Sequence, residues 1–468
     1  MAGPLSVWLL IAIALYRDHL LVASSALFGL LVAFVSLWLA SPSLPRQVTP
    51  LLLLDGYAYF YVGLILVSTM AVILLSYHYL EKHADYREEF YLLLTLAVLG
   101  SSILVASNHF ISFFLGLEIL SVSLYSLIAY FRDRRQSFEA GIKYLILASV
   151  SVAFLLFGMA LVYADQGSLA FDDITWSQAI AGGAAQGGLL LAGLALLVVG
   201  IGFKLALVPF HLWAPDVYEG APAPVAAFVA TVSKGGMAAL LLRLFAQADV
   251  MAQPSIFVVF GIVAVASMVI GNLLALLQSN LKRILAYSSI AHLGYLLVAF
   301  MASGDLGATA VTLYLVTYFV TTLAAFGIVT VLSPGQRDAD RLDDYRGLFW
   351  RRPWLAAILT ITMLSLAGIP LTAGFIGKFY VLAAGVGSEL YWLVIILVVS
   401  STIGLYYYLR VIVSMYLASP EEGEAAPTPA LPLTGGVVLA VLAMVLIWLG
   451  VYPTPLLETI RLAIAGLL

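Results

Sequence analysis

Cysteine is absent from this sequence of 468 residues, and only 10% of its residues are charged. Without cysteine the chain cannot form disulfides, bind zinc through thiolates, hold an iron–sulfur cluster or use a cysteine nucleophile. It also lacks a P-loop, an HExxH motif and a GxGxxG motif that opens a helix after a strand. The formal net charge of −4 gives no indication of nucleic-acid binding. We therefore expect no cofactor, metal ion or nucleic acid in this chain. We also expect no cleavable leader, because no basic segment precedes the first apolar run.

Hydrophobic residues make up 63% of the chain, and its mean hydropathy is +1.07. A soluble protein of this length could not remove so much apolar surface from water. An outer-membrane barrel would show segments of about ten residues with alternating polarity, whereas the apolar runs here are long and unbroken. The composition thus predicts an all-α polytopic membrane protein.

Thirteen apolar runs are long enough to cross a bilayer, which takes about 20 helical residues. They cover residues 20–40, 57–79, 89–107, 109–130, 140–163, 188–210, 223–246, 255–277, 283–302, 307–332, 354–383, 390–417 and 433–452. A fourteenth run at 3–16 is short for a span, so either this helix is tilted or truncated or the chain starts further upstream. The stretch 454–468 is expected to be a short amphipathic tail at the membrane interface.

Lysines and arginines between the runs separate into two sets when fourteen spans are counted. One side carries thirteen: Arg17, Lys82, Arg87, Arg132, Arg134, Arg135, Lys282, Arg283, Arg337, Arg341, Arg346, Arg351 and Arg352. The other side carries Arg46, Arg243 and Arg461. Because cytoplasmic loops are rich in lysine and arginine, the first side is predicted to be cytoplasmic and both termini periplasmic. The charged loop 333–353 is then either a solvated connector that sets topology or a docking surface for a partner.

Four of the six lysines lie inside predicted spans: Lys143, Lys204, Lys234 and Lys378. A lysine at the centre of a membrane helix opposes insertion by about 2.5–3.5 kcal/mol. Lys143 begins its helix four residues after Glu139, so it can either snorkel and form a helical ion pair or have a functional role. The other three lie too deep for snorkelling to explain them, and we expect them to be functional.

Glu118 is the one carboxylate deep in a predicted span. It shares a helical face with Ser121 and Tyr125, and its expected partner is Lys204 or Lys234. A buried Glu–Lys pair can hold or release a proton as the distance between its members changes, or it can lock two helices together as a static pair.

His292 is the one histidine well inside a span, and Ser288, Ser289 and Tyr295 are on or near its helical face. A histidine titrates near neutral pH, which suits a proton relay. A hydrogen-bonded histidine in the core fits the same pattern.

Two spans contain interior prolines near their lysines. Pro209 follows Lys204 in FKLALVPFH, and Pro370 precedes Lys378 in SLAGIPLTAGFIGKFY. Proline removes a backbone hydrogen bond and frees carbonyl groups. Within a membrane such breaks persist only where they are buried in protein or line a hydrated cavity.

The spacing of these residues indicates an internal repeat. Glu118 precedes Lys204 by 86 residues, and His292 precedes Lys378 by 86 residues. We interpret this as two inverted five-helix repeats, at 89–246 and 255–417. Three helices at 1–88 precede them, and a final helix and tail at 433–468 follow.

The segments that hold these residues resemble a known family. GLEILSVSLYSLIAY, GFKLALVPFHLWAPDVYEGAPAPV, NLKRILAYSSIAHLGYLLVA and MLSLAGIPLTAGFIGKFYVL are similar to the antiporter-like membrane subunits of respiratory complex I, and the resemblance covers nearly the whole chain. It implies fourteen helices, two inverted repeats and discontinuous seventh and twelfth helices. It also implies proton-relay roles at the matching family positions, which here are Glu118, Lys143, Lys204, Lys234 and Lys378. Relatives often have lysine where His292 stands, and the N-terminus is shorter than the family's usual first helix.

From this resemblance we expect a proton-translocating membrane-arm subunit of an NADH:quinone oxidoreductase in a bacterial inner membrane. Flavin, iron–sulfur clusters and quinone would lie in partner subunits, and other membrane-arm subunits would flank this chain within the lipid bilayer. Separation of Glu118 from Lys204 would release a proton that passes along internal water through Lys234 and His292 toward Lys378. One alternative is a subunit of a multi-subunit cation/proton antiporter, which shares the fold. Another is a non-conducting structural spacer.

Overall fold

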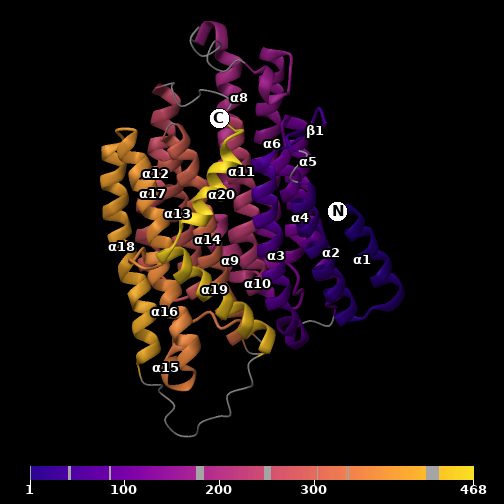
Figure 1. Ribbon diagram of the computed structural model, residues 1–468, viewed down its shortest axis with the longest axis vertical. Coiled ribbons are helices and arrows are strands. Elements are labelled where there is room, and N and C mark those ends of the chain that lie inside the picture. The colour runs from indigo at the N-terminus through magenta and orange to yellow at the C-terminus, as the bar shows by residue number, and fades with distance from the viewer. Residues whose placement is uncertain are drawn as a thin grey trace.

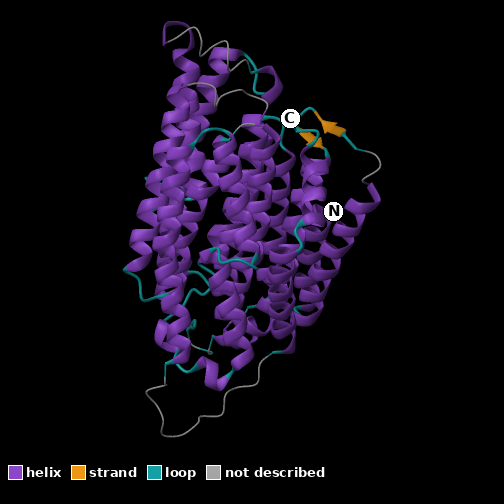
Figure 2. Ribbon diagram, turned by 60° about the vertical axis from the view of Figure 1, so that its left-hand side comes forward, coloured by secondary structure: helices purple, strands orange, loops and turns teal. Residues whose placement is uncertain are grey.

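Long helices run side by side along the longest axis of the molecule (Figures 1 and 2). The computed structural model describes residues 2–40, 44–83, 86–174, 184–246, 254–302, 304–333, 335, 337–417 and 432–467. Helices α1 and α2 lie at one edge of the bundle and α18 at the opposite edge (Figure 1). The bundle therefore extends sideways, from α1 at one edge to α18 at the other, as well as along its helices.

The helices are bounded as follows: α1 Ala2–Tyr16, α2 His19–Ala40, α3 Gly56–His83, α4 Glu88–Ala106, α5 Phe110–Ile128, α6 Arg135–Gln166, α8 Ala184–Leu205, α9 Trp213–Gly220, α10 Ala223–Phe228, α11 Lys234–Ala246, α12 Pro254–Leu276, α13 Leu281–Met301, α14 Gly304–Leu332, α15 Leu348–Arg351, α16 Pro353–Ala367, α17 Ala373–Gly387, α18 Tyr391–Tyr416, α19 Leu433–Val451 and α20 Thr454–Ile464. Short 3-10 turns occupy Phe171–Asp173 and Leu342–Tyr345, and a π-helical segment, Val229–Ser233, joins α10 to α11.

Twelve helical segments of the described ranges are long and apolar enough to cross a membrane. Three shorter apolar helices, α1, α16 and α17, add to these. Because α16 and α17 together occupy the span predicted at 354–383, the twelve segments, this broken pair and α1 make up the fourteen predicted from the sequence. The protein is a multi-pass α-helical membrane protein, as its composition predicts.

The first predicted discontinuity is present between α8 and α9. Helix α8 ends at Leu205, four residues before Pro209, and the chain becomes helical again at Trp213. The indole nitrogen of Trp213 donates a hydrogen bond of 2.8 Å to the carbonyl of Phe203, which also accepts from the amide of Ala206 at 2.9 Å. A side chain of α9 therefore hydrogen-bonds back to the end of α8 across the break.

The second predicted discontinuity is present between α16 and α17. Helix α16 ends at Ala367, three residues before Pro370, and α17 begins at Ala373. Within this gap the hydroxyl of Thr372 donates to the carbonyl of Ile369 at 2.7 Å. Both breaks thus precede a proline, which disfavours helical geometry in the residue before it.

Each break contains a non-glycine residue in the left-handed region of backbone space. Ala206 has φ 57° in the first break, and Leu371 has φ 69° in the second. An L-residue adopts this conformation at an energetic cost that the surrounding structure must offset. The two breaks are therefore defined local structures and not frayed helix ends.

Close helix packing sets the position of Glu118. A Cβ added at Gly100 in α4 would lie 2.5 Å from the amide nitrogen of Leu120 in α5. In the second half, a Cβ at Gly271 in α12 would lie 2.7 Å from the amide nitrogen of Ala291 in α13. Glycine at these two positions lets the backbones touch, and it fixes α5 and α13 against their neighbours.

The chain is nearly all helical, as the predicted fold class requires, and it contains one short hairpin. Arg46–Thr49 and Leu52–Leu54 form an antiparallel two-stranded hairpin, β1 and β2. The run LLLL at 51–54 is too short for a membrane helix, and its backbone pairs with the preceding segment instead. The hairpin lies near the upper end of the bundle, whereas α15 lies at the lower end (Figures 1 and 2).

The predicted interfacial tail is helix α20, and it packs against the bundle. Its side chains Leu457 and Ile460 are buried, and the position of Gly56 in α3 leaves only 3.4 Å between an added Cβ and the carbonyl of Ala463. Glycine at that position lets α20 approach α3 closely. The C-terminal helix is thus part of the helical packing.

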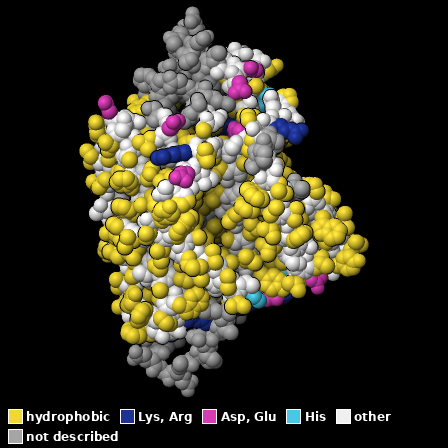
Figure 3. Space-filling model, viewed as in Figure 1, with side chains coloured by type: hydrophobic (Ala, Val, Ile, Leu, Met, Phe, Trp, Pro, Cys, Tyr) yellow, Lys and Arg dark blue, Asp and Glu magenta, His cyan; other side chains and the backbone are white. Residues whose placement is uncertain are grey.

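Hydrophobic side chains cover the middle of the visible face of the molecule, and charged side chains gather toward its upper and lower parts (Figure 3). Large apolar side chains are exposed on the bundle, including Phe28, Trp38 and Ile395. Such a belt matches the hydrocarbon region of a bilayer, in which exposed apolar groups are not penalised.

Candidate functional site

Lys204 lies at the end of α8, beside the first helix break, and its side chain is buried. Its Nζ donates hydrogen bonds to Ser121 Oγ at 2.7 Å and to Tyr144 OH at 3.2 Å. The ammonium also lies 5.2 Å from the centre of the Tyr144 ring. Neutral oxygens and an aromatic face therefore hold this cation.

Glu118 forms no ion pair with Lys204 or Lys234 in the described part of the chain, so the expected direct contact is not formed. Its Oε1 is buried without a hydrogen-bond partner. Lys204 instead contacts Ser121, which follows Glu118 by three residues and shares its helical face. Lys204 therefore contacts the helical face that carries Glu118, through a serine hydroxyl one turn further along α5.

Lys234 is the first residue of α11, directly after the π-helical segment, and it is almost fully buried. Its Nζ donates to Ser289 Oγ on α13 at 2.6 Å and lies 5.3 Å from the ring centre of Tyr218. The hydroxyl of Tyr318 on α14 also donates to Ser289, at 2.7 Å. Lys234 thus contacts the helices of the second predicted repeat.

His292 on α13 is buried in a cluster of tyrosines. Its Nδ1 lies 2.7 Å from the hydroxyl of Tyr314, and its Nε2 lies 3.1 Å from the hydroxyl of Tyr408. Tyr408 is also hydrogen-bonded to Ser288, the residue next to Ser289. Both ring nitrogens therefore have phenolic partners, which suits proton exchange and also satisfies a buried histidine.

Lys378 on α17 lies beside the second helix break, and its side chain is buried. Its Nζ donates to the carbonyls of Leu366 and Ala367, at 2.9 and 2.8 Å, and to Ser401 Oγ at 2.8 Å. These carbonyls belong to the end of α16, so the lysine itself caps the broken helix. The ammonium lies 5.3 Å from the ring centre of Tyr295, whose ring also contacts His292.

A small cavity lies between the histidine cluster and the second break. It has a volume of about 10 Å³, which is room for about one water molecule. Its walls include His292, Tyr318, Thr321 and Ser365, and the last two hydroxyls lie 3.1 Å apart. Polar side chains therefore continue from Lys234 through the second half of the bundle toward Lys378.

Lys204, Lys234 and Lys378 are hereafter the central lysines. Each one is buried, contacts the face of a tyrosine and donates to serine hydroxyls or backbone carbonyls. None of them is in a salt bridge within the described residues. A lysine in such surroundings can lose and regain a proton, because no carboxylate locks its charge in place.

Lys143 is placed differently from the central lysines. Its side chain is 44% exposed, and it forms ion pairs of 2.8 Å with both Glu139 and Asp216. Arg283 also contacts Asp216, at 3.0 Å. Burial alone would raise the pKa of the Asp216 carboxyl, but the hydrogen bonds from Lys143 and Arg283 hold it below its usual range. The helical ion pair that the spacing from Glu139 predicts is present.

The ion pairs of Lys143 line a cleft at the charged end of the bundle. A chamber of about 190 Å³ is bordered by Lys143, Asp216 and Glu219, and a second chamber of about 370 Å³ is bordered by Glu219, Arg135 and Arg341. Tyr144, the residue after Lys143, is buried and accepts the hydrogen bond from Lys204. Two consecutive residues of α6 therefore face the two places: Lys143 lines the cleft, and Tyr144 contacts Lys204.

Two buried ion pairs were missed by the sequence analysis, which placed Arg243 and Lys282 in loops. Arg243 is 1% exposed and forms a bidentate pair with Asp55, with both N–O distances at 2.8 Å. Lys282 is also buried, and its Nζ lies 2.6 Å from Asp338. Both cations lie close to a helix end in the sequence. No local pattern indicates that distant segments of the chain bury them.

The loop 333–353 is not a simple solvated connector, because one of its own residues, Asp338, is buried. Besides Lys282, the Asp338 carboxylate accepts a hydrogen bond of 2.6 Å from Tyr79 OH and lies 3.5 Å from Arg134. Burial would raise the pKa of Asp338, but Lys282, Tyr79 and Arg134 together hold it below its usual value. This loop therefore ties three helices together.

Comparison with protein families places these features in context. Residues 107–404 match the family described as NADH:quinone oxidoreductase/Mrp antiporter, TM. This match includes Glu118, all three central lysines and His292. The chain belongs to this family.

Solved structures agree with this membership. A subunit of respiratory complex I from Thermus thermophilus is 34% identical to this antiporter-like subunit, with a TM-score of 0.82 over 98% of this chain and 97% of that chain. Two more distant structures show the same fold. One is from an archaeal membrane-bound sulfane sulfur reductase, at 24% identity, a TM-score of 0.86 and coverage of 100% of this chain and 96% of that chain. The other is from the Mrp complex of a Dietzia species, at 20% identity, a TM-score of 0.87 and coverage of 100% and 96%.

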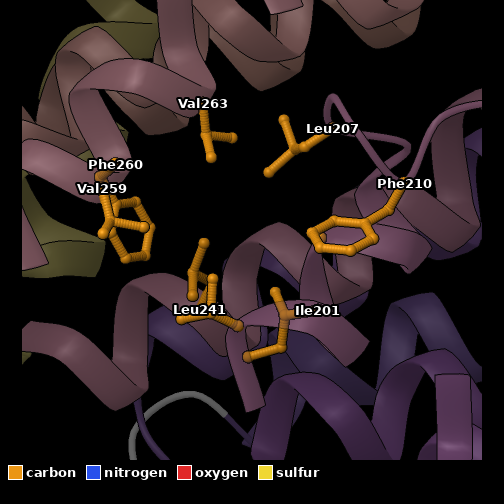
Figure 4. Close-up of a pocket in the computed structure, with 9 residues that line it drawn as sticks. Ile201, Leu207, Phe210, Leu241, Val259, Phe260 and Val263 are labelled. Atoms are coloured by element: carbon orange, nitrogen blue, oxygen red, sulfur yellow. The ribbon is translucent and has the colours of Figure 1, made fainter. Parts of the chain in front are cut away.

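The antiporter-like subunit also has an apolar cavity behind its first helix break (Figure 4). Leu207 and Phe210 from the break face Ile201, Leu241 and Val263 across this space. Its volume is about 20 Å³, and its lining is almost entirely apolar. Apolar cavities of this kind remain dry, and none of the central lysines lines this one.

Proposed function

We propose that this chain is the subunit N-type membrane subunit of a proton-translocating NADH:quinone oxidoreductase. Its proton route would run from Glu118 through the central lysines and His292. The observation that carries this proposal is the row of three buried lysines, each held by neutral hydroxyl or carbonyl groups. Burying three such cations opposes insertion by about 2.5–3.5 kcal/mol each, and proton transport gives a reason for keeping them.

The redox chemistry takes place in other subunits in this proposal. Flavin, iron–sulfur clusters and quinone belong to partner subunits, and other membrane-arm subunits lie on both flanks. A change passed from a neighbour alters the distance between Glu118 and Lys204, whose ammonium donates to Ser121 on the same helix as Glu118. Moving the carboxylate away removes a favourable interaction with the ammonium, and Lys204 then releases its proton toward Lys234.

The proton next moves through the contacts of the second half. Lys234 reaches Ser289, the tyrosine cluster surrounds His292, and Lys378 caps the second break. The cleft beside Lys143 supplies water and titratable groups on the side that we propose is cytoplasmic in a bacterial inner membrane. In this arrangement Lys143 acts at the entrance, and the termini are periplasmic.

The replacement of Lys204 by alanine tests the proposal. In membrane vesicles that contain the assembled complex, Lys204→Ala should abolish most NADH-driven proton pumping, because the first titratable group of the route is lost. Lys82→Ala is the matched control, since Lys82 is an exposed lysine at the end of α3. Full pumping by Lys204→Ala at normal assembly levels would rule out this route.

A second candidate function is that of a subunit in a multi-subunit cation/proton antiporter. It is favoured by the description of the matching family, which covers both kinds of complex, and by a fold shared with the Mrp complex. Native purification distinguishes the two. Copurification with flavin and iron–sulfur subunits supports the oxidoreductase, and cation-dependent proton exchange without NADH supports the antiporter. If the chain is only a structural spacer, replacing all three central lysines with leucine should leave pumping unchanged.

A further inference from the structure

Ser289 occupies the junction between Lys234 and the histidine cluster. It lies on α13, its side chain is 1% exposed, and its Oγ accepts hydrogen bonds from Lys234 Nζ and Tyr318 OH, at 2.6 and 2.7 Å. The hydroxyl of Tyr218 is 3.5 Å away. Within the described residues, the bond to Ser289 is the single hydrogen bond that the Lys234 ammonium makes. One of the three N–H groups of this buried cation thus has a hydrogen-bond acceptor among the described residues, and that acceptor is the serine oxygen.

We propose that Ser289 is the hydroxyl through which a proton passes between Lys234 and the cluster around His292. This inference rests on the proposed function. A serine hydroxyl has one proton to donate and two lone pairs that accept, so it can take a proton on one side and release its own on another. In the structure Lys234 and Tyr318 both donate to Ser289, so transfer onward requires the Tyr318 hydroxyl to rotate and become the acceptor.

The transfer moves one proton and leaves Ser289 unchanged. An N–H bond of Lys234 Nζ breaks, and an O–H bond forms at Ser289 Oγ. For this step the Tyr318 hydroxyl, which donates to Ser289 in the structure, turns so that it accepts from Ser289 instead. The proton that Ser289 held then passes to the Tyr318 oxygen, and the phenolic proton of Tyr318 passes to a water molecule, which gives a proton to the His292 imidazole. Tyr318 and His292 both line the small cavity, which has room for about one water molecule.

The neighbouring serine does not offer this junction. Ser288 is hydrogen-bonded to Tyr408, which contacts His292 Nε2, and it makes no hydrogen bond to a lysine within the described residues. Ser288 therefore belongs to the histidine side only. Ser289 is the position where a lysine of the first predicted repeat and a tyrosine of the second meet on one atom.

The test is the pumping rate of the assembled complex in membrane vesicles that carry Ser289→Ala. We expect the rate of NADH-driven pumping to fall on the order of tenfold, the range for loss of one hydrogen bond to a charged group. Ser289→Thr keeps the hydroxyl and should retain most of the rate, whereas Ser289→Cys keeps the size but is a poor hydrogen-bond partner and should be slow. Ser76→Ala is the control, because Ser76 is a buried serine that bonds only to its own helix at Val72 O.

A double variant separates a shared route from general damage. Tyr318→Phe alone should also slow pumping, and Ser289→Ala combined with Tyr318→Phe should be no slower than the slower single variant, because both act on one path. Wild-type rates in Ser289→Ala and Ser289→Cys would overturn the inference, as would equal losses in Ser289→Thr and Ser289→Ala. If Lys204→Ala is inactive while Ser289→Ala pumps normally, only the role of Ser289 is refuted and the proposed function stands.

Discussion

At the scale of single residues, the buried cations differ in what accepts their hydrogen bonds. The central lysines donate to hydroxyls and carbonyls, whereas Arg243 and Lys282 are paired with the carboxylates of Asp55 and Asp338. A salt bridge with good geometry holds a charge in place, and breaking a buried one is costly. The first group is therefore suited to exchanging protons, and the second to holding helices together.

The pair between Arg243 and Asp55 makes a prediction about stability. Arg243→Met leaves Asp55 buried without its partner, and we expect it to lower the stability of the chain by about 3–5 kcal/mol. The measurement is the thermal unfolding of the detergent-solubilised complex, together with the amount of chain in the membrane. Arg17→Met is the control, because the Arg17–Glu89 pair is exposed and should contribute at most about 1 kcal/mol. Equal effects of both variants would show that burial of the pair is unimportant.

At the scale of elements, the two helix breaks place a lysine beside freed backbone groups. In the first break Trp213 and the Ala206 amide both donate to the Phe203 carbonyl, and Lys204 donates across the bundle to Ser121. In the second break Lys378 itself donates to the free carbonyls of α16. The two sites have related construction and different partners, so their lysines are expected to respond differently to the same movement.

The packed loop after α14 makes a prediction about pH. The pKa of Asp338 is held below its unfolded value, so its stabilising contribution is complete above the unfolded value of about 4 and is lost as pH falls through the lower folded value. Thermal stability should therefore decline below about pH 4, and Asp338→Asn should remove much of this decline while destabilising the protein at neutral pH.

The measurement for this loop is thermal unfolding as a function of pH. Asp343→Asn is the matched control, since Asp343 is 83% exposed and its contact with Arg346 is 3.5 Å long. It should leave both the stability at neutral pH and the decline of stability in acid unchanged. If thermal stability declined in acid as much in Asp338→Asn as in the wild type, the decline could not be assigned to the Asp338 carboxylate.

At the scale of the whole molecule, the charge distribution predicts its orientation in the membrane. The described cleft with Arg135 and Arg341 lies on the arginine-rich side, and the β1–β2 hairpin lies at the other end of the bundle from α15 (Figure 1). Because the chain contains no cysteine, single introduced cysteines can report which side is accessible.

Cysteine labelling in vesicles checks this orientation. Arg341→Cys should react with a membrane-impermeant reagent from the cytoplasmic side only, and Val48→Cys, on the exposed hairpin, from the opposite side only. The unmodified chain serves as the unlabelled control. Labelling of both positions from one side would contradict the predicted topology.

The sequence was informative about the site because its signals are local. A lysine in a long apolar run, a proline near it and a run of membrane-spanning length can all be recognised along the chain, and both breaks lie at the predicted prolines. Contacts between distant segments leave no such local signal. The tyrosines around His292 come from several helices, and each one alone resembles an ordinary aromatic residue in a membrane helix.

Composition and pattern determined that this chain is a multi-pass helical membrane protein with buried lysines beside two broken helices, because apolar length and proline act on the segment that contains them. Tertiary structure alone decided which oxygens hold each cation. It paired Lys204 with Ser121 in place of Glu118, placed Lys143 at an exposed ion-paired cleft, and buried Arg243 and Lys282 against carboxylates. Those outcomes depend on which helices pack together, and packing is a property of the assembled fold.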